Sequence, residues 1–537
     1  MSRFARTDRR HLRTARMLPL LAALLVAGCR ATLPTAEAPQ ARNVIVMIND
    51  GAGWGAWDAA AYWQYGSRDG MPYAHFPTRL GMRTTPLTTS NTPTYRMGAD
   101  VEYDPAQAWD ATPTGDAALP FAGYGYTATQ ATDSAAAGTA LASGHKTYNN
   151  AINHDNSGNP VAPVTFLAHS LGKATGVVTS VPFSHATPAA FGAQNASRNQ
   201  YHAIARQMLH EGRLDLVMGT GGPGYNVNGT ACDALVHGEV DTGCDAPDEF
   251  VSQADWQAVA AGRLQPAGSA RPWQLLRTRE EFQALADGTR HVDGPLLGVP
   301  QVARTLQQAR QAEVTGRDAA QPSGDALITT VPTLATMTRG ALRYLQHRSD
   351  AGFVLMIEGG ATDWAAHTSK CGTQWSYGAC DDHPEYGRTI EETVDFNDAV
   401  AEVIAWVDAH SNWDDTLLIV TTDHDNSMPL GPDADRVPFQ PVVNQGAGRM
   451  PGISFRPTGN HTRALVPVWA KGAGASLLER QVIGVDPGYA RHVGYSDGRY
   501  IDNTAVAHAV RAALLGQTLT CAQDATACPD AQRVPAN

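Results

Sequence analysis

The sequence has few charged residues, and it lacks any long run of lysine and arginine after its first twenty positions. Charged residues make up 17% of the 537 positions, whereas apolar residues make up 43%. A chain of this composition can bury a large core, which excludes an intrinsically disordered protein. Acidic residues outnumber basic ones by 52 to 40, giving a formal net charge of -12. We therefore expect no nucleic-acid partner.

A long apolar run is also missing near the N-terminus, where residues 18–26 are apolar but too few to span a membrane. Arginines precede this run and Val26-Ala27-Gly28-Cys29 ends it, an order typical of a secretory signal. These four residues resemble the lipobox of bacterial lipoproteins, in which the cysteine is acylated. We therefore expect a signal peptide over residues 1–28 and attachment to a membrane through lipid on Cys29, in the periplasm or at the outer membrane. Ordinary signal cleavage in this segment is the alternative, and the arginines leave the export route open between Sec and twin-arginine.

Cysteine is scarce, with seven residues in all, of which six remain once Cys29 is assigned to lipid. The six fall as close neighbours in the sequence: Cys232 with Cys244, Cys371 with Cys380, and Cys521 with Cys528. Export to an oxidising compartment favours three local disulfides. No pair has the Cys-x-x-Cys spacing of a zinc knuckle or redox motif, so we expect no zinc on these cysteines.

Short apolar runs bounded by polar residues or glycine alternate with helical patterns along the chain. The runs that predict buried strands are residues 44–48, 175–179, 214–218, 353–357, 417–420 and 465–469. The patterns that predict helices are residues 200–210, 331–347, 385–410 and 505–515. This order predicts an α/β fold, a three-layer sandwich with a mostly parallel central sheet and helices on both faces.

The composition also predicts how the chain is divided. Residues 29–42 are small, polar and proline-containing, as expected for a flexible linker behind a lipid anchor. Residues 43–518 form the expected main domain, and residues 519–537 a C-terminal tail that contains a cysteine pair. Residues 90–127 and 431–458 show no sustained periodicity, so we expect inserted loop regions there.

Carboxylates and imidazoles occur around the carboxyl ends of the predicted strands, where open α/β sheets form their ligand crevices. These residues are Asp50, Glu358, Asp363, His367, Asp423, His424 and, ahead of the last strand, His461. Asp363 and His367 are four positions apart, which places both on one face of a helix. Singly, such residues are more often helix caps or structural histidines than ligands. Together they supply the mixed nitrogen and oxygen ligands of zinc and the hard oxygens of magnesium.

Ser134 opens a run of small residues, Ser134–Ala140, that has good helix potential. At a helix N-terminus the free backbone N–H groups and the dipole favour an anion, either a serine alkoxide or the phosphoryl oxygens that it attacks. The alternative is a serine that only caps the helix.

From Asn43 to about Leu515 the sequence resembles bacterial and animal alkaline phosphatases. The motifs that carry the resemblance are Asn49–Gly53, Thr132–Asn149, His185–Ala189, Glu358-Gly359 with Asp363 and His367, and Thr422-Asp423-His424. The resemblance implies the alkaline phosphatase fold and hydrolysis of phosphate monoesters through a phosphoserine on Ser134. It also implies two zinc ions and one magnesium ion as cofactors, and it leaves homodimerisation open.

The resemblance assigns a role to each matching residue. One zinc would be held by Asp363, His367 and His461. The second would be held by Asp50, Asp423, His424 and the Ser134 oxygen. Magnesium would be held by Asp50, Thr187 and Glu358. Arg198 would grip the phosphate with its bidentate guanidinium, and Asp133 would orient Arg198.

The chain departs from the enterobacterial members around the magnesium site, where His185 and Trp364 replace an aspartate and a lysine. The loss of an acidic neighbour is expected to weaken the retention of magnesium.

Three related classes of two-metal enzyme are alternatives: pyrophosphatase-type phosphodiesterases, sulfatases and cofactor-independent phosphoglycerate mutases. A sulfatase needs a modified cysteine or serine in a Pro/Arg motif, which the segment at Ser134 lacks. A phosphodiesterase is expected to lack Thr187, Glu358 and Arg198, which crowd the space of a second ester group. A non-catalytic scavenger of zinc or phosphate is a further alternative, disfavoured because Ser134 is intact.

Overall fold

The structure, a computed structural model, describes residues 40–96, 98–234, 244, 248–368, 378–379 and 386–519. Contacts divide the chain into Met1–Glu37, which lies outside the described residues, and Ala38–Asn537, which contains the fold. The expected signal peptide, the lipidated Cys29 and the cysteine pairs at 371 and 380 and at 521 and 528 also lie outside the described residues. None of the described helices is both long and apolar enough to cross a membrane.

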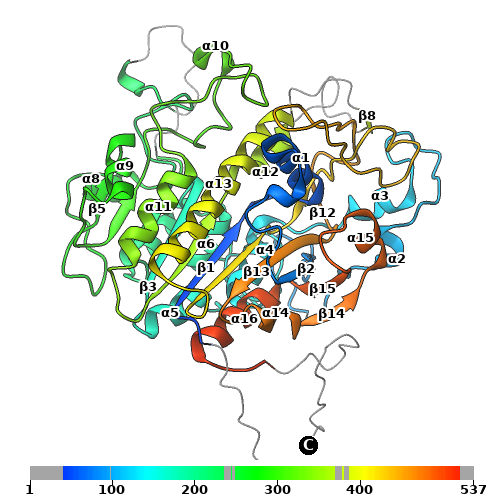
Figure 1. The fold of residues 1–537 in the computed structure, drawn as a ribbon. Helices are drawn as coiled ribbons and strands as arrows, with labels where there is room; N and C mark the ends of the chain where they lie inside the picture. The colour runs from blue at the N-terminus through cyan, green and yellow to red at the C-terminus, as the bar shows by residue number, and fades with distance from the viewer. Residues whose placement is uncertain are drawn as a thin grey trace, which may run out of the picture. The chain divides into compact units, whose positions relative to one another are not determined.

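An eleven-stranded sheet forms the centre of the fold, in the order β14-β15-β2-β13-β9-β1-β7-β3-β4-β6-β5 (Figure 1). Its strands are β1 (Asn43–Ile48), β2 (Thr78–Arg83), β3 (Ala174–Pro182), β4 (Leu216–Thr220), β5 (Gln274–Leu276), β6 (Leu296–Gly298), β7 (Phe353–Glu358), β9 (Thr416–Thr421), β13 (Val466–Gly472), β14 (Val482–Val485) and β15 (Arg499–Asp502). The part from β9 to β5 is parallel throughout, whereas β13 runs antiparallel to both of its neighbours. Two short pairs lie outside this sheet: β8 (Gly378–Ala379) with β11 (Phe455–Arg456), and β10 (Asp425–Asn426) with β12 (His461–Thr462).

Helices occupy most of the connections between strands. They are α1 (Trp54–Tyr65), α2 (Pro105–Ala108), α3 (Ala122–Thr127), α4 (Ser134–Ser143), α5 (Val164–Ser170), α6 (Ala186–Gly192), α7 (Tyr201–His210), α8 (Gln253–Ala260), α9 (Arg279–Asp287), α10 (Ala312–Thr315), α11 (Leu334–Leu345), α12 (Ala361–Thr368), α13 (Gly387–His410), α14 (Ser476–Glu479), α15 (Pro487–His492) and α16 (Thr504–Leu515). The predicted α/β class, with a mostly parallel sheet, is confirmed.

The side chains of β1 point alternately to the two faces of the sheet, which gives the fold two apolar cores. Ile45 and Met47 pack into one core with residues of α1, α9, α11 and α13. Val44, Val46 and Ile48 pack into the other with residues of α4, α5, α6, α7 and α16. A strand that is buried on both faces is apolar at most positions, which explains why the central strands contain nearly continuous apolar runs in the sequence.

The two regions expected to be inserted loops pack against each other. The first, residues 90–127, is not wholly irregular, because it contains α2 and α3. The Tyr124 ring lies 5.2 Å from the Phe439 ring of the second region, and the Tyr124 hydroxyl donates to the Ala434 carbonyl at 2.9 Å. The ring contact and the hydrogen bond of Tyr124 together hold the first region against the second.

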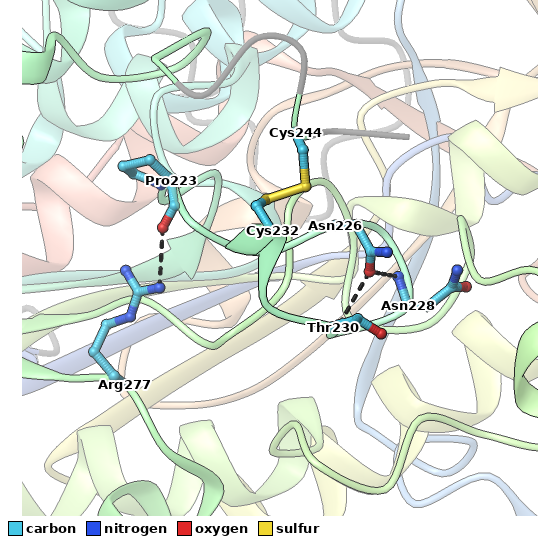
Figure 2. The surroundings of a disulfide bond; sticks show 7 residues. All are labelled: Pro223, Asn226, Asn228, Thr230, Cys232, Cys244 and Arg277. Atoms are coloured by element: carbon cyan, nitrogen blue, oxygen red, sulfur yellow. Dashed lines mark hydrogen bonds between the residues drawn. A yellow bond between two sulfur atoms is a disulfide. The ribbon is translucent and has the colours of Figure 1, made fainter. Parts of the chain in front are cut away.

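A disulfide joins Cys232 and Cys244, whose Cα atoms are 5.7 Å apart, and this confirms the pairing expected there (Figure 2). Both cysteines lie in the segment between β4 and α8. A turn ahead of Cys232 is held by the Asn226 side chain, which accepts from the N–H groups of Asn228 and Thr230 at 2.9 and 3.0 Å.

A buried carboxylate on α13 makes the stability of the fold depend on pH. Glu392 is 4% exposed, and its Oε1 accepts no hydrogen bond within the described part of the chain. Burial, reinforced by Asp395, raises the pKa of Glu392 from 4.5 to about 8. Its protonation therefore stabilises the folded state at low pH, and this contribution is lost as the pH rises from 4.5 to about 8.

We expect Glu392→Gln to raise the free energy of unfolding by roughly 1 to 3 kcal/mol near pH 9 and to change it little near pH 5. Urea unfolding at both pH values measures the difference. The neighbouring Glu391 provides the control, because it accepts from Arg310 Nη2 at 2.6 Å, so Glu391→Gln should destabilise the protein at both pH values. A Glu392→Gln protein no more stable than the parent near pH 9 would contradict the expectation.

Candidate active site

Parallel pairing brings the predicted acidic residues to one edge of the sheet. Ile48, the last residue of β1, is in register with Glu358 of β7 and with Thr421 of β9. Asp50 lies two residues after Ile48, and Asp423 lies two residues after Thr421. The three carboxylates therefore meet at the carboxyl ends of three adjacent strands, as the sequence predicted.

Asp50, Asp423 and His424 form one fully buried group. Asp423 Oδ1 accepts from the N–H groups of Gly51 and His424 at 3.1 and 2.9 Å. His424 Nε2 lies 3.3 Å from Asp423 Oδ2 and 3.6 Å from Asp50 Oδ1. Burial, reinforced by the neighbouring carboxylates, raises the pKa of Asp50 well above its ordinary value and that of Asp423 to about 6.

Asp363, His367 and His461 form a second group beside the first. The two Nε2 atoms of the histidines are 3.0 Å apart, and they lie 3.4 and 3.2 Å from the Asp363 oxygens. His367 Nδ1 is 3.1 Å from the Gly459 carbonyl and His461 Nδ1 is 2.8 Å from the Thr132 carbonyl. Because each Nδ1 must carry its proton to donate to a carbonyl, Nε2 is the atom with which each ring, when neutral, can bind a cation.

His424 connects the two groups. The residue belongs to a set with Asp50 and Asp423 and also to a set with Asp363 and His461, in each of which one ligand atom per residue lies within 4.8 Å of the others. Burial, with His461 nearby, lowers the pKa of His424 well below its ordinary value, so the ring is a neutral imidazole. Neutral imidazole is the form that binds a metal ion.

The donor set fits bound cations. Asp50 Oδ1, Glu358 Oε1 and Asp423 Oδ2 are buried carboxylate oxygens that accept no hydrogen bond from any described residue. Leaving such oxygens unpaired in a protein interior is costly, and cations offset that cost. Oxygen and imidazole donors together suit zinc, whereas an all-oxygen set suits magnesium.

The all-oxygen set lies around Glu358. Thr179 donates its hydroxyl hydrogen bond to Glu358 Oε2, and the Thr187 hydroxyl donates to Asp50 Oδ2 at 3.4 Å. Burial raises the pKa of Glu358 to about 7. Thr187, at the start of α6, and Glu358 are thus both beside Asp50, as the sequence predicted.

Ser134 is the first residue of α4, and Asp133 caps that helix. The Ala136 N–H donates to Asp133 Oδ1 at 2.9 Å, so Ser134 does not serve as the cap. Ser134 Oγ lies 3.3 Å from His424 Nε2, at the shared histidine of the two groups. The second oxygen of Asp133 accepts from Arg198 Nη1 at 3.1 Å. Arg198 thus pairs with the residue that directly precedes Ser134.

His185 lies beside Arg198, and Trp364 packs against His185. His185 Nε2 is 3.4 Å from Arg198 Nη2, and its ring meets the Trp364 ring edge to face at 5.2 Å between centroids. Burial, together with Arg198, lowers the pKa of His185 to about 3. His185 is therefore a neutral imidazole. Unlike a carboxylate, it adds no negative charge near the all-oxygen set of Asp50, Thr187 and Glu358.

Other residues of the site had no role assigned from the sequence. Asn426 Nδ2 donates to Asp363 Oδ1 at 2.7 Å. Thr362 donates its hydroxyl to Asn49 Oδ1 at 2.6 Å, which ties the end of β1 to α12. Gly51 has a φ of +72°, and a Cβ there would lie 2.7 Å from Asp363 Oδ1, so only glycine lets the two ligand groups approach. Of these residues, Asn426 could have been found from the sequence, because it lies only two positions after the candidate residue His424.

Comparison with known proteins agrees with this geometry. Residues 41–450 match the sequence profile of the family described as alkaline phosphatase. Alkaline phosphatase 4 of Bacillus subtilis is 30% identical over 298 residues, which cover 55% of this chain and 49% of the relative. Alkaline phosphatase of Escherichia coli K12 is 27% identical over 335 residues, which cover 60% of this chain and 64% of the relative. The chain thus spans about half the length of the Bacillus relatives that it matches.

Solved structures agree on the fold. The alkaline phosphatase from the Antarctic bacterium TAB5 matches with a TM-score of 0.53 at 20% identity, over 89% of this chain and 100% of that one. The family profile spans β1 to β10 and contains ten of the eleven candidate site residues, His461 lying beyond its end. The resemblance inferred from the motifs is therefore confirmed: the chain belongs to the alkaline phosphatase family.

Proposed function

We propose that the protein hydrolyses phosphate monoesters to an alcohol and inorganic phosphate through a phosphoserine on Ser134. The observation that carries the proposal is the position of the Ser134 hydroxyl. It lies at the N-terminus of α4, 3.3 Å from the histidine shared by two cation-binding groups, and next to an Arg198 oriented by Asp133. A nucleophile, an anion-binding guanidinium and a cluster of metal ligands thus converge.

We assign the metals as the family resemblance implies. One zinc would be held by Asp363, His367 and His461, and the second by Asp50, Asp423, His424 and the Ser134 oxygen. Bound zinc lowers the pKa of a coordinated hydroxyl or water and stabilises negative charge on oxygen. The unpaired oxygens of Asp50 and Asp423 and the facing Nε2 atoms of His367 and His461 support these two sets.

Magnesium would be held by Asp50, Thr187 and Glu358. Variants of the TAB5 enzyme with one histidine replaced by glutamate or aspartate have magnesium in their M3 site. In this chain the neutral His185 lies near the same kind of set, which supports weaker retention of magnesium than of zinc.

The residues of the chain divide the reaction between them. Arg198 holds two non-bridging oxygens of the substrate phosphate, and the N-terminus of α4 faces the same anion. Ser134 loses its hydroxyl proton to solvent, and its Oγ forms a bond to phosphorus as the bond from phosphorus to the alcohol oxygen breaks. The departing oxygen takes up a proton from water to give the alcohol. Water then attacks the phosphoserine and releases phosphate, which restores Ser134 and retains configuration at phosphorus after two inversions.

The test of the proposal is turnover of p-nitrophenyl phosphate compared with bis(p-nitrophenyl) phosphate. We expect the monoester to be the preferred substrate, because Thr187, Glu358 and Arg198 occupy the space of a second ester group. A protein that binds zinc but turns over neither ester would be a scavenger, and preference for the diester would favour a phosphodiesterase.

We also propose that Cys29 anchors the mature protein to a membrane in the periplasm or at the outer membrane, followed by the linker over residues 29–42. The carboxyl end of this linker already contacts the fold, because the Ala41 N–H donates to the Ala513 carbonyl at 2.9 Å. Cys29→Ser is expected to move the protein from the membrane fraction to the soluble fraction, measured by fractionation of whole cells. If the variant stays as membrane-bound as the parent, Cys29 is not the anchor.

A further inference from the structure

The residues on either side of Thr132 are tied down by one side chain, that of Asn149. Asn149 Nδ2 donates to the Ala131 carbonyl at 3.3 Å, and Asn149 Oδ1 accepts from the Asp133 N–H at 3.0 Å. The Thr132 carbonyl between them accepts from His461 Nδ1 at 2.8 Å. One amide thus fixes the short segment that ends at Asp133, directly before the nucleophile.

The next residue, Asn150, holds the segment that carries Arg198. Its carbonyl accepts from the Arg198 N–H at 2.8 Å, and its Nδ2 donates to Ser197 Oγ at 3.1 Å. Asn150 has a φ of +83°, in the left-handed region that asparagine tolerates better than most residues. Two residues later, Ile152 forms an antiparallel bridge with Asn195, so the two segments run alongside each other.

We propose that Asn149 and Asn150 are positioning residues that set the place of Arg198 relative to Ser134. They are adjacent in the chain, and they bond to two different segments, one ending at Asp133 and the other at Arg198. This inference rests on the proposed function, because the phosphate of a monoester is the ligand that Arg198 is positioned to hold.

The ion pair between Asp133 and Arg198 is not enough by itself to fix the position of Arg198. Its side chains are 21% and 17% exposed, and an ion pair partly open to water contributes little by itself to holding a long side chain. A small displacement of a group that binds the reacting phosphate is costly to catalysis. Hydrogen bonds to the backbone of both partners restrain the pair where the ion pair alone does not.

The experiment is a double-mutant cycle of Asn149→Leu with Arg198→Ala, measured on the full chain with saturating zinc and magnesium. The readouts are the competitive inhibition constant of inorganic phosphate and kcat/KM for p-nitrophenyl phosphate. We expect Asn149→Leu alone to raise the inhibition constant about tenfold. In the Arg198→Ala background Asn149→Leu should raise the inhibition constant by less than about twofold. The effect should shrink because Asn149 acts on phosphate binding through Arg198, which that background lacks.

Asn156 provides a matched control, because its side chain also bonds to a loop but lies outside the site. Asn156 Nδ2 donates to Thr94 Oγ1 and the Arg96 carbonyl at 2.7 and 2.8 Å, and its Oδ1 accepts from the Thr94 N–H at 2.9 Å. Asn156→Leu should lower thermal stability but leave the phosphate inhibition constant at the parent value.

Equal effects of Asn149→Leu with and without Arg198, or no effect in either background, would overturn the inference. If Asn149→Leu does not fold, Asn149→Asp completes the same cycle, because it keeps the acceptor for the Asp133 N–H and lacks the donor to Ala131. Failure of the parent to hydrolyse any monoester would overturn the proposed function instead. Phosphate affinity measured by calorimetry would then still decide whether Asn149 acts through Arg198.

Discussion

Replacing Ser134 with alanine is expected to lower kcat by about a thousandfold or more and to abolish the phosphoserine. Ser134 is 2% exposed and its Oγ lies 3.3 Å from His424 Nε2, so its hydroxyl is positioned for the proposed first step. Slow residual turnover is compatible with the proposal, because water can still reach a phosphate bound beside Arg198. Arg198→Ala should be less damaging and should mainly weaken phosphate binding, by roughly 1.5 to 3 kcal/mol.

The decisive measurement is a short incubation with radiolabelled phosphate at acidic pH, followed by denaturation and peptide mapping. Label should appear on the peptide that contains Ser134 and on no other. Ser143 is a matched control in the same helix: it is also 2% exposed, and its hydroxyl donates to the Thr139 carbonyl at 2.7 Å. Ser143→Ala should keep the parent turnover. Label on another residue, or a Ser134→Ala protein with the parent kcat, would remove Ser134 from the mechanism.

The centre of the fold could be predicted from the sequence, whereas its edges could not. All six predicted strands exist, because strands buried on both faces have nearly continuous apolar runs, and β1, β7 and β9 show such runs most clearly between their polar end residues. β2 was missed because Arg79, Gly81 and Arg83 interrupt its apolar pattern. β5 and β6 have three residues each, which is too short for a periodicity to be detected.

The juxtaposition of Asp50, Glu358 and Asp423 could be predicted because these residues end or closely follow strands that lie side by side. What the sequence could not indicate is which hydrogen bonds hold each ligand. The carbonyls that fix the tautomers of His367 and His461 belong to Gly459 and Thr132, and a carbonyl carries no signature of its own in the sequence. The sharing of His424 between two groups is likewise a property of three-dimensional packing.

Removing the bound metals with a chelator is expected to abolish turnover and to lower the melting temperature. Burial raises the pKa values of Asp50, Glu358 and Asp423, and repulsion between carboxylates adds to it: Asp423 acts on Asp50 and Glu358, and Asp363 acts on Asp423. A cation favours the ionised carboxylates, so metal binding should release protons and stabilise the fold. Restoring zinc should restore most of the turnover, and added magnesium should raise it further.

The pH dependence of this stabilisation has a definite sign. In the metal-free protein burial raises the pKa of Glu358 from 4.5 to about 7, so the stability that its protonation contributes is lost as the pH rises through that window. In the metal-loaded protein the carboxylate is already ionised, and this loss should be absent. The difference in melting temperature between loaded and metal-free protein should therefore widen as the pH rises from 4.5 to about 7. Glu358→Gln should flatten that dependence. Chelator-treated protein that retains the parent turnover, or a difference in melting temperature that narrows over this window, would show that these carboxylates do not hold a catalytic metal.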